Sequence, residues 1–332
     1  MSEQVGIVVI GRNEGERLVR CLVSVRDSGR VVYVDFGSTD GSVQKAMELG
    51  ADIVPLDLSR PFTAARARNA GLARLRSLVP GVKYVQFVDG DCEIRPEWIT
   101  FACGMMESDP GIAVVCGRLE ERSPDTSIYN RLCQMEWDGP SGTVAACGGI
   151  ALYSVDALMK SGCFREEMIA GEEPELGFRL RRLGMRLVRL DAPMAMHDAA
   201  MTRFGQWFRR ARRGGHAYAE CFWLHRSSYF RARETARVIA WGIVLPIVIA
   251  ASACMALVTP WALLGVGAGL CMYLFTLCRA ARNRLQRGTR SADAVVYALF
   301  CTMAKFPEAL GVCQYAFNRT FGRRTRLIEY KR

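Results

Sequence analysis

The stretch "YVQFVDGDCEIRPEWI", residues 84–99, holds the pattern from which the fold of this chain is deduced. Its apolar first part predicts a buried strand, and the strand ends abruptly at Asp89-Gly90-Asp91. Two carboxylates one residue apart can be an ordinary polar turn. They can also hold a metal ion, because hard divalent cations take carboxylate oxygens and keep substrate phosphate oxygens in their shell. The rest of the sequence decides between these two interpretations.

Short apolar runs alternate with helical patterns over the first 200 residues. Strands are expected at 5–10, 31–35, 53–55, 84–88 and 114–117, and helices at 14–25, 42–49, 63–78 and 97–108. This alternation predicts βαβ units, and hence an α/β fold with a mostly parallel sheet flanked by helices. Ligands of such sheets bind at the carboxyl ends of the strands. Asp35, Asp89 and Asp91 all lie at such ends.

Two long apolar segments follow in the second part of the chain. Residues 238–258 and 261–278 carry no charged side chain, and only Thr259-Pro260 separates them. A membrane-spanning helix needs roughly 20 apolar residues. The pattern therefore predicts a transmembrane helical hairpin over residues 238–278.

The net charge of +11 comes from arginine, and the arginines gather around this hairpin. By the positive-inside rule, the clusters before and after it place both of its ends in the cytoplasm. The first residues do not resemble a signal peptide, so residues 1–202 are expected on the cytoplasmic side of a bacterial-type inner (plasma) membrane. Residues 203–237 interleave arginines with aromatic side chains, which suits contact with membrane lipids better than with nucleic acid. In the basic region 279–332, residues 292–317 are expected to form an interfacial helix or a third span.

Polar loops follow the first two expected strands. Asn13 and Glu14 come after the strand at 5–10, and Asn13 could simply cap the next helix. The strand at 31–35 delivers Asp35 to its tip, and a tight turn containing Ser38 and Asp40 follows. Such a turn can cap a helix or hydrogen-bond a ligand.

A third polar segment, "MIAGEEPELGFRLRRLG", covers residues 168–184. Acidic residues are favoured at a helix start. Because proline suits the first position of a helix, we expect Glu172 and Glu173 to lie just outside the first turn, with Pro174 beginning it.

The chain has thirteen cysteines, but they form no C-x-x-C pair and no Cys/His cluster with zinc spacing. Most are expected to be small buried hydrophobic residues in a reducing compartment.

Taken in order, these motifs resemble the family 2 glycosyltransferases of the GT-A fold over roughly residues 4–200. The segments that carry the resemblance are "IVVIGRNEGERLVRCLVSV", "VDFGSTDGS", "RARNAGLARL", "FVDGDCEIRPEWI" and "CGGIALYSVDALMKSGCFREEMIAGEEPELGFRLRRLG". The resemblance implies a UDP- or GDP-sugar donor, transfer with inversion to an acceptor hydroxyl, and residues 1–202 as the catalytic domain.

Site residues are implied by the same resemblance. Asp35 would contact the nucleobase or ribose, Arg68 and Asn69 would lie near the nucleotide, and Asp89 would stand by the ribose or sugar. The remaining donor-binding positions would be Asn13, Glu14, Ser38 and Asp40.

The resemblance also implies the catalytic and metal-binding residues. Asp91 would bind Mg²⁺ or Mn²⁺ on the diphosphate, and His197 matches a histidine that lies near the metal in some members. Glu173 would be the general base, at a position where the family more often has aspartate, so Glu172 or Glu175 could share or take that role.

Two other functions were weighed. A nucleotidyltransferase also uses a parallel sheet and acidic metal ligands, but it needs a glycine-rich, basic phosphate loop that "GRNEGE" resembles poorly. A non-catalytic membrane scaffold is disfavoured by the intact acidic residues. The nearest match to the Q-x-x-R-W motif of processive synthases is "GQWFRRARRGG", which lacks R-W, so transfer of a single sugar is expected. The membrane hairpin suggests a lipid-linked or glycan acceptor in envelope or exopolysaccharide synthesis.

Overall fold

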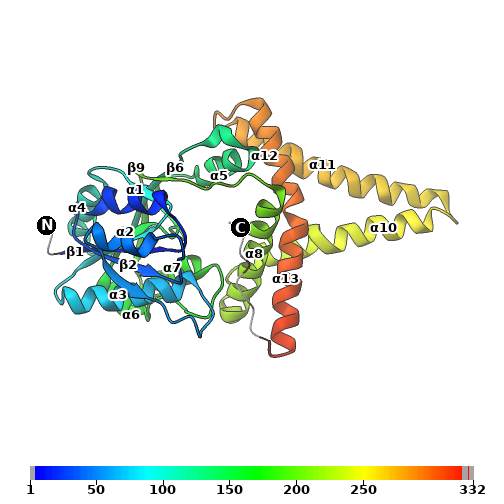
Figure 1. Ribbon diagram of the computed structural model, residues 1–332. Coiled ribbons are helices and arrows are strands. Elements are labelled where there is room, and N and C mark those ends of the chain that lie inside the picture. Colours follow the sequence, from blue (N-terminus) through cyan, green and yellow to red (C-terminus); the bar gives the residue numbers. More distant parts are fainter. Residues whose placement is uncertain (1–3, 324–327, 329–332) are drawn as a thin grey trace. The chain divides into compact units, whose positions relative to one another are not determined.

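The computed structural model describes residues 4–323 and residue 328. The described chain forms two compact units, with the boundary between Thr202 and Arg203. The first unit is built on a mixed sheet with helices packed around it (Figure 1). The strand order is β3-β2-β1-β4-β8-β6-β9-β5, and β7 pairs with β9.

The first half of this sheet is parallel, as the sequence predicts. It consists of β1 (Val5–Gly11), β2 (Arg30–Asp35), β3 (Asp52–Pro55) and β4 (Tyr84–Asp89). Strand β1 is buried along its whole length, which explains its unbroken apolar sequence. The register pairs Gly11 with Asp35 and Ile10 with Asp89, so the tips of β2 and β4 lie on either side of the tip of β1.

The second half of the sheet is mixed. Strand β8 (Ala151–Ser154) runs antiparallel between β4 and β6 (Ile112–Glu121), and β9 (Arg186–His197) pairs parallel to β6. The short strands β5 (Cys92–Ile94) and β7 (Gly142–Thr143) lie antiparallel to β9. Strand β6 is longer than the expected 114–117 and carries its carboxyl end on to Glu121.

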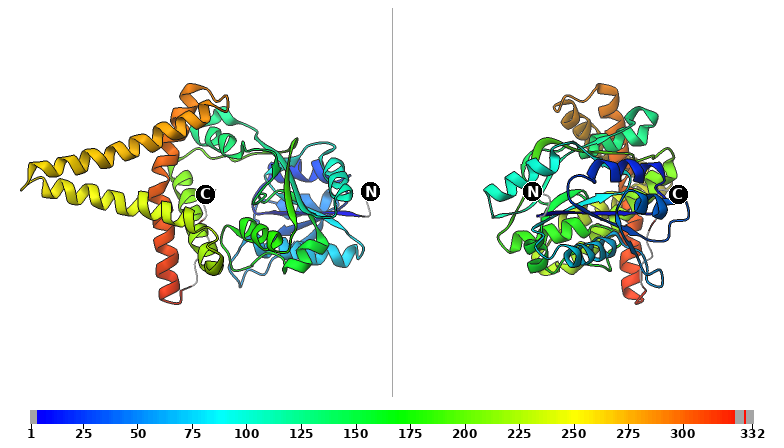
Figure 2. Two further views of the ribbon diagram at one scale, coloured as in Figure 1. Left: turned by 180° about the vertical axis from the view of Figure 1, so that it is seen from behind. Right: turned by 60° about the vertical axis from the view of Figure 1, so that its left-hand side comes forward.

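Within the described part of the first unit, seven α-helices connect and cover these strands. They are α1 (Glu16–Val25), α2 (Ser42–Glu48), α3 (Ala64–Leu78), α4 (Trp98–Ser108), α5 (Ile128–Trp137), α6 (Val155–Ser161) and α7 (Glu172–Arg182). Figures 1 and 2 show α1 and α3 on opposite faces of the sheet. Thr63 is the N-cap residue of α3, since its hydroxyl accepts a hydrogen bond from the Arg66 amide at 3.1 Å.

Helix α3 packs unusually close to the sheet because of Gly71. A Cβ atom at this position would lie 2.3 Å from a methyl group of Val8 and 2.9 Å from one of Val34. Any larger residue would push α3 away from β1 and β2. The close approach sets the distance of Arg68, one turn earlier on α3, from the sheet.

The second unit is helical. It contains α8 (Phe204–Leu224), α9 (Ala232–Ile239), α10 (Leu245–Met255), α11 (Leu263–Leu285), α12 (Ser291–Met303) and α13 (Lys305–Thr320). Among the described residues, three helical stretches are long and apolar enough to cross a membrane, namely 232–255, 260–285 and 291–320. The first two contain most of the predicted hairpin, and Figure 2 shows α10 and α11 extending side by side.

Small residues bring α10 and α11 into close contact. Gly265 and Gly269 lie four residues apart on α11, and Cβ atoms there would approach within 2.6 Å of Ser252 and 2.4 Å of Ile249. This small-xxx-small arrangement allows the two backbones to approach closely, which is how helices pair in lipid.

The helical stretch 232–255 contains a π-helical turn at residues 240–244, which no local sequence pattern predicts. There the Leu245 amide donates to the Ala240 carbonyl, five residues back. Pro246 has no N–H to continue this pattern to the Trp241 carbonyl. The hydroxyl of Tyr273, on α11, donates to that carbonyl at 2.5 Å.

Helix α13 packs along α8 so closely that the two backbones are in contact. A Cβ on Gly215 would lie 1.9 Å from the Glu308 carbonyl oxygen, and one on Gly311 would lie 2.0 Å from the Arg212 carbonyl oxygen. In Figures 1 and 2, α13 crosses the direction of the α10–α11 hairpin instead of running alongside it. The α8–α13 pair is therefore one tightly packed layer within the second unit.

Candidate active site

The loop after β2 is organised around Asp35. One of its carboxylate oxygens accepts hydrogen bonds from the amides of Gly37 at 2.9 Å and Ser38 at 3.0 Å, and the other accepts one from the Tyr33 hydroxyl at 3.0 Å. Gly37 adopts φ 88°, a left-handed conformation that favours glycine. Asp35 thus holds the main chain of this loop in place at the end of the strand.

Asn13 joins the loop after β1 to the loop after β2. Its side-chain oxygen accepts a hydrogen bond from the Thr39 main-chain amide at 2.7 Å. The main-chain amide of Asn13 donates to the Ser38 hydroxyl at 2.9 Å. The interpretation of Asn13 as a helix cap is wrong, because α1 begins at Glu16 and Gly15 is its N-cap residue. The loop between Asn13 and the helix turns through positive φ angles at Asn13 and Gly15, which carries the side chain across to the neighbouring loop.

The other two predicted residues of these loops have local partners. Glu14 forms an ion pair with Arg17 at 2.8 Å, and a Cβ on Gly90 would lie 3.3 Å from its side chain. Asp40 accepts a hydrogen bond from the Ser42 amide at 3.1 Å, one residue from the α2 N-cap residue. Glu14 therefore lies directly beside the Asp89-Gly90-Asp91 turn.

Arg68 is buried on α3 and gathers three predicted acidic residues around one guanidinium. Its nitrogens lie 3.2 Å from Asp89, 2.9 Å from Glu172 and 3.2 Å from Glu173. Asp89 arrives from β4 and the two glutamates from the start of α7. Residues far apart in sequence are thereby fixed at one point by charge-assisted hydrogen bonds.

Asn69, the neighbour of Arg68, contacts a different segment. Its amide group donates to the Phe164 carbonyl at 2.9 Å and accepts from the Phe164 amide at 3.1 Å. These two bonds anchor the loop that leads to α7. The position of Glu172 and Glu173 consequently depends on both residues of the Arg68-Asn69 pair.

Glu172 and Glu173 are the first two residues of α7. The expectation that they precede the first turn and that Pro174 begins it is wrong. Proline is tolerated at the third position as well, because the first four amides of a helix have no partner within it. Gly171, with φ 81°, reverses the chain immediately before the two acids.

Burial raises the pKa of Glu173 to about 7. The negative charge of Glu172 adds to this increase, and the positive charge of Arg68 opposes it. A carboxylate with this pKa is a suitable proton acceptor near neutral pH. The arrangement thus favours Glu173 as the base and Glu172 as the neighbouring charge that tunes it.

The cluster leaves no room for a side chain at residue 149. A Cβ on Gly149 would lie 2.2 Å from an Arg68 nitrogen and 3.0 Å from a Glu173 carboxylate oxygen. We expect Gly149→Ala to lower kcat/KM by about 100-fold, because a displacement of about 1 Å in a catalytic group can cost that much. The measurement is steady-state kinetics beside Gly148→Ala, whose added Cβ would meet nothing within 4 Å. Equal activity of the two variants would contradict this geometry.

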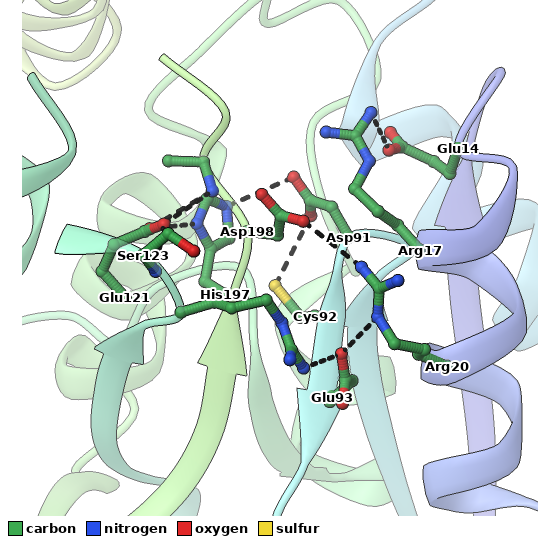
Figure 3. Close-up of polar contacts among 12 residues, drawn as sticks. Glu14, Arg17, Arg20, Asp91, Cys92, Glu93, Glu121, Ser123, His197 and Asp198 are labelled. Carbon is green, nitrogen blue, oxygen red and sulfur yellow. Dashed lines mark hydrogen bonds and ion pairs between the residues drawn. The ribbon is translucent and has the colours of Figure 1, made fainter. Parts of the chain in front are cut away.

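Asp91 and His197, the two residues predicted to bind metal, lie close together beside the Asp89-Gly90-Asp91 turn (Figure 3). The antiparallel register of β5 and β9 pairs Cys92 with His197, and this brings His197 Nε2 to 3.3 Å from Asp91 Oδ2. Cys92, which the sequence analysis treated as a core residue, donates its thiol hydrogen to the other Asp91 oxygen at 3.5 Å. The two aspartates of the motif therefore have different partners.

Several residues around His197 were not predicted from the sequence. Glu121, at the end of β6, lies 3.4 Å from His197 Nδ1, and the ring of Trp137 meets the imidazole edge-on. Arg20 of α1 donates to Glu93 at 2.9 Å and to Asp198 at 3.3 Å, which ties α1 to both flanks of the site (Figure 3). Glu121 was missed because the expected strand ended at residue 117. A strand extended to residue 121 would have placed Glu121 at a carboxyl end, where site residues were sought.

The donor set of this group fits a divalent cation. Asp91 and His197 offer a carboxylate oxygen and an imidazole nitrogen, ligands that Mn²⁺ accepts, and the carboxylate also suits Mg²⁺. The ligand atoms of Asp91, Cys92 and His197 all lie within 4.8 Å of one another. With Asp91 and His197 as ligands, the remaining coordination positions of the cation stay available for phosphate oxygens and water.

The mixed sheet, with its polar residues at the carboxyl ends of the parallel strands, is a GT-A fold. Residues 6–162 match the model of the family "Glycosyl transferase family 2". Over these residues the first unit is similar to the family 2 glycosyltransferases, as the sequence motifs indicate.

Comparisons with known proteins agree with this assignment. The pre-mycofactocin glycosyltransferase of Mycobacterium tuberculosis is 28% identical over 279 residues, which are 80% of this chain and 53% of that protein. The chain thus spans about half the length of this relative.

Two solved structures share the fold. A mannosyltransferase from Pyrobaculum calidifontis, in complex with GDP-Man and Mn²⁺, aligns over 96% of this chain and 87% of its own, with a TM-score of 0.57 and 17% identity. Residues 1–349 of S. aureus TarS align over 96% and 92%, with a TM-score of 0.52 and 13% identity. At these identities the likeness concerns the fold alone.

Proposed function

We propose that the protein is a membrane-anchored, inverting and metal-dependent glycosyltransferase that moves one sugar from a nucleotide-sugar donor to an acceptor hydroxyl. The observation that carries this proposal is the Arg68 cluster. It places Glu173, whose pKa lies near 7, beside Asp89 at the end of the central strand. A base and a donor-binding acid held by one guanidinium suit a direct displacement between donor and acceptor.

In this proposal the reaction is a single displacement. Glu173 accepts the proton of the acceptor hydroxyl while that oxygen bonds to the anomeric carbon and the bond from this carbon to the diphosphate breaks. Arg68 keeps the Glu173 carboxylate oriented, and Glu172 keeps its pKa raised. Inversion follows because attacking and leaving oxygens lie on opposite faces of the sugar.

The donor nucleotide is assigned to the loops after β1 and β2. Asn13 joins these loops, Asp35 shapes the second, and Ser38 and Asp40 lie within it. Bound Mg²⁺ or Mn²⁺, held by Asp91 and His197, would neutralise the negative charge on the leaving diphosphate. Asp89, two residues before Asp91, is connected to Glu173 through Arg68, which forms ion pairs with both carboxylates.

A donor screen tests the proposed activity. Purified full-length protein is incubated with Mn²⁺ or Mg²⁺ and a panel of UDP- and GDP-sugars, and release of the nucleoside diphosphate is measured. GDP-mannose belongs in the panel because the P. calidifontis mannosyltransferase was solved with it. We expect at least one donor to be bound and hydrolysed; binding of none would refute the proposal.

The acceptor is proposed to be lipid-linked, as the helical second unit suggests. A membrane-anchored enzyme meets such acceptors in the plane of the bilayer. Acceptor assays should include polyprenyl-linked sugars and soluble glycans. A pre-mycofactocin acceptor is a useful third arm because the M. tuberculosis relative is named for it.

We also propose that α13 lies in the headgroup layer and does not span the membrane. Its backbone contacts that of α8 at Gly215 and Gly311, and α8 carries arginines at 209, 210, 212 and 213. A spanning α13 would draw these arginines into hydrocarbon, at about 2.5–3.5 kcal/mol for each one at the centre. The helix also contains the Lys305–Glu308 ion pair at 2.5 Å, which suits an interfacial position.

This topology predicts that the catalytic domain and the end of the chain share the cytoplasmic side. Green fluorescent protein fused after Arg332 is expected to fluoresce, and alkaline phosphatase fused there to be inactive. Fusions after Thr259, between α10 and α11, serve as the matched control and are expected to behave in the opposite way. Active phosphatase after Arg332 would establish a third span.

A further inference from the structure

We infer that Glu121 is a positioning residue of the metal site, which fixes the proton of His197 on Nδ1 so that Nε2 faces Asp91 and the cation. The inference rests on the proposed function, because it takes Asp91 and His197 as metal ligands. Neither the family match nor the relatives assign a role to Glu121.

The sheet register places His197 between two buried carboxylates. Glu121 and His197 are the last residues of β6 and β9 and are paired across these strands. Glu121 Oε2 lies 3.4 Å from Nδ1 on one side of the ring, and Asp91 Oδ2 lies 3.3 Å from Nε2 on the other. The side chains of both Glu121 and Asp91 are fully buried.

Hydrogen-bond chemistry gives the two ring nitrogens different roles. Both flanking carboxylates only accept, so each can take a hydrogen from the ring. When a cation binds the Nε2 lone pair, the ring hydrogen lies on Nδ1 and is donated to Glu121. The other nitrogen then presents its lone pair toward Asp91, and a cation between nitrogen and carboxylate satisfies both. Metal-binding histidines commonly have such a carboxylate on their second nitrogen.

Glu121 is itself held firmly. Its Oε1 accepts from the Ser123 amide at 3.4 Å, from the Asn130 side-chain amide at 3.4 Å and from the Ala199 amide at 3.3 Å. The Ala199 amide also reaches Oε2, at 3.2 Å. Three donors converging on Oε1 leave Oε2 as the oxygen that faces His197.

This arrangement determines what Glu121→Gln does. The amide oxygen keeps the donors Ser123, Asn130 and Ala199, and the Ala199 amide loses its second contact at the Oε2 position. The NH₂ group takes that position and donates to Nδ1. The ring hydrogen then moves to Nε2, where it points at Asp91 and removes the lone pair offered to the metal. The substitution therefore changes the tautomer with little change in shape.

The test measures Mn²⁺ affinity by electron paramagnetic resonance of the free ion, with UDP and with GDP, on the full-length protein. We expect Glu121→Gln to weaken Mn²⁺ binding at least tenfold. Glu120→Gln is the matched control. Glu120 directly precedes Glu121 in β6, but it pairs with Arg95 at 2.6 Å on the protein surface. It should bind Mn²⁺ like the unmodified protein.

A second readout reports the tautomer directly, with Mg²⁺ bound in place of Mn²⁺. Nitrogen-15 spectra of the three histidines should show His197 with its hydrogen on Nδ1 in the unmodified protein and on Nε2 in Glu121→Gln. An unchanged tautomer, or unchanged Mn²⁺ affinity in a folded Glu121→Gln protein, would overturn the inference. Failure of the unmodified protein to bind Mn²⁺ would instead refute the metal-dependent function, and the inference with it.

Discussion

Glu173→Gln is expected to lower kcat by about 10²–10⁴-fold while donor affinity stays unchanged, because general-base catalysis contributes about this factor. The amide keeps the shape of the carboxylate but cannot accept the acceptor's proton. Arg68 still has Glu172 and Asp89 as partners, at 2.9 and 3.2 Å, so the cluster should remain assembled. Donor affinity is measured calorimetrically and kcat by release of the nucleoside diphosphate.

The pH dependence provides the control for this substitution. The base acts when deprotonated, so kcat/KM of the unmodified enzyme should rise with pH through about 7 and fall tenfold per unit well below it. Glu173→Gln should lose this dependence, whereas Glu167→Gln, an exposed glutamate six residues earlier, should retain both rate and profile. Full activity of Glu173→Gln would move the role of base to a neighbouring residue.

Asp91→Asn is expected to abolish measurable Mn²⁺ binding and to lower kcat/KM by roughly 10³-fold or more, because a metal contributes several kcal/mol of charge stabilisation. The Asp91 side chain is fully buried beside His197, and the amide removes the charge without leaving a cavity. The measurements are Mn²⁺ titration and steady-state kinetics on the same preparation.

Asp89→Asn distinguishes the two aspartates of the motif. Asp89 pairs with Arg68 and not with His197, and it is more exposed than Asp91. We expect this variant to retain Mn²⁺ affinity and to lose donor affinity. Loss of Mn²⁺ binding in both variants would mean that the two carboxylates share the ion.

The parallel half of the sheet was predictable from local pattern. Residues 5–11 are apolar along their length, and so are residues 84–88 apart from Gln86, because both faces of these strands are largely buried. The polar residues that follow mark the carboxyl ends. The Thr63 cap and the acids at the strand tips follow from the same local chemistry. Arg68 needed the family resemblance, since nothing in its helix indicates that it is buried.

The rest of the site depends on pairing between distant strands. Strand β9 mixes arginines, a proline and apolar residues, so its sequence has no strand periodicity. Its register with β5 and β6 is what places His197 between Asp91 and Glu121. Local patterns do not encode such a register, which is why Glu121 was missed.

In the proposed membrane topology, the Tyr273–Trp241 hydrogen bond affects how the chain enters the membrane during synthesis. The helix containing Pro246 leaves the ribosome first, and lipid offers no donor for a carbonyl that lacks its backbone partner. The donor is on the next helix, so the first helix is complete only when the second has arrived. We therefore expect the translocon to release the two helices as a pair, so that the phenol of Tyr273 can donate to the Trp241 carbonyl.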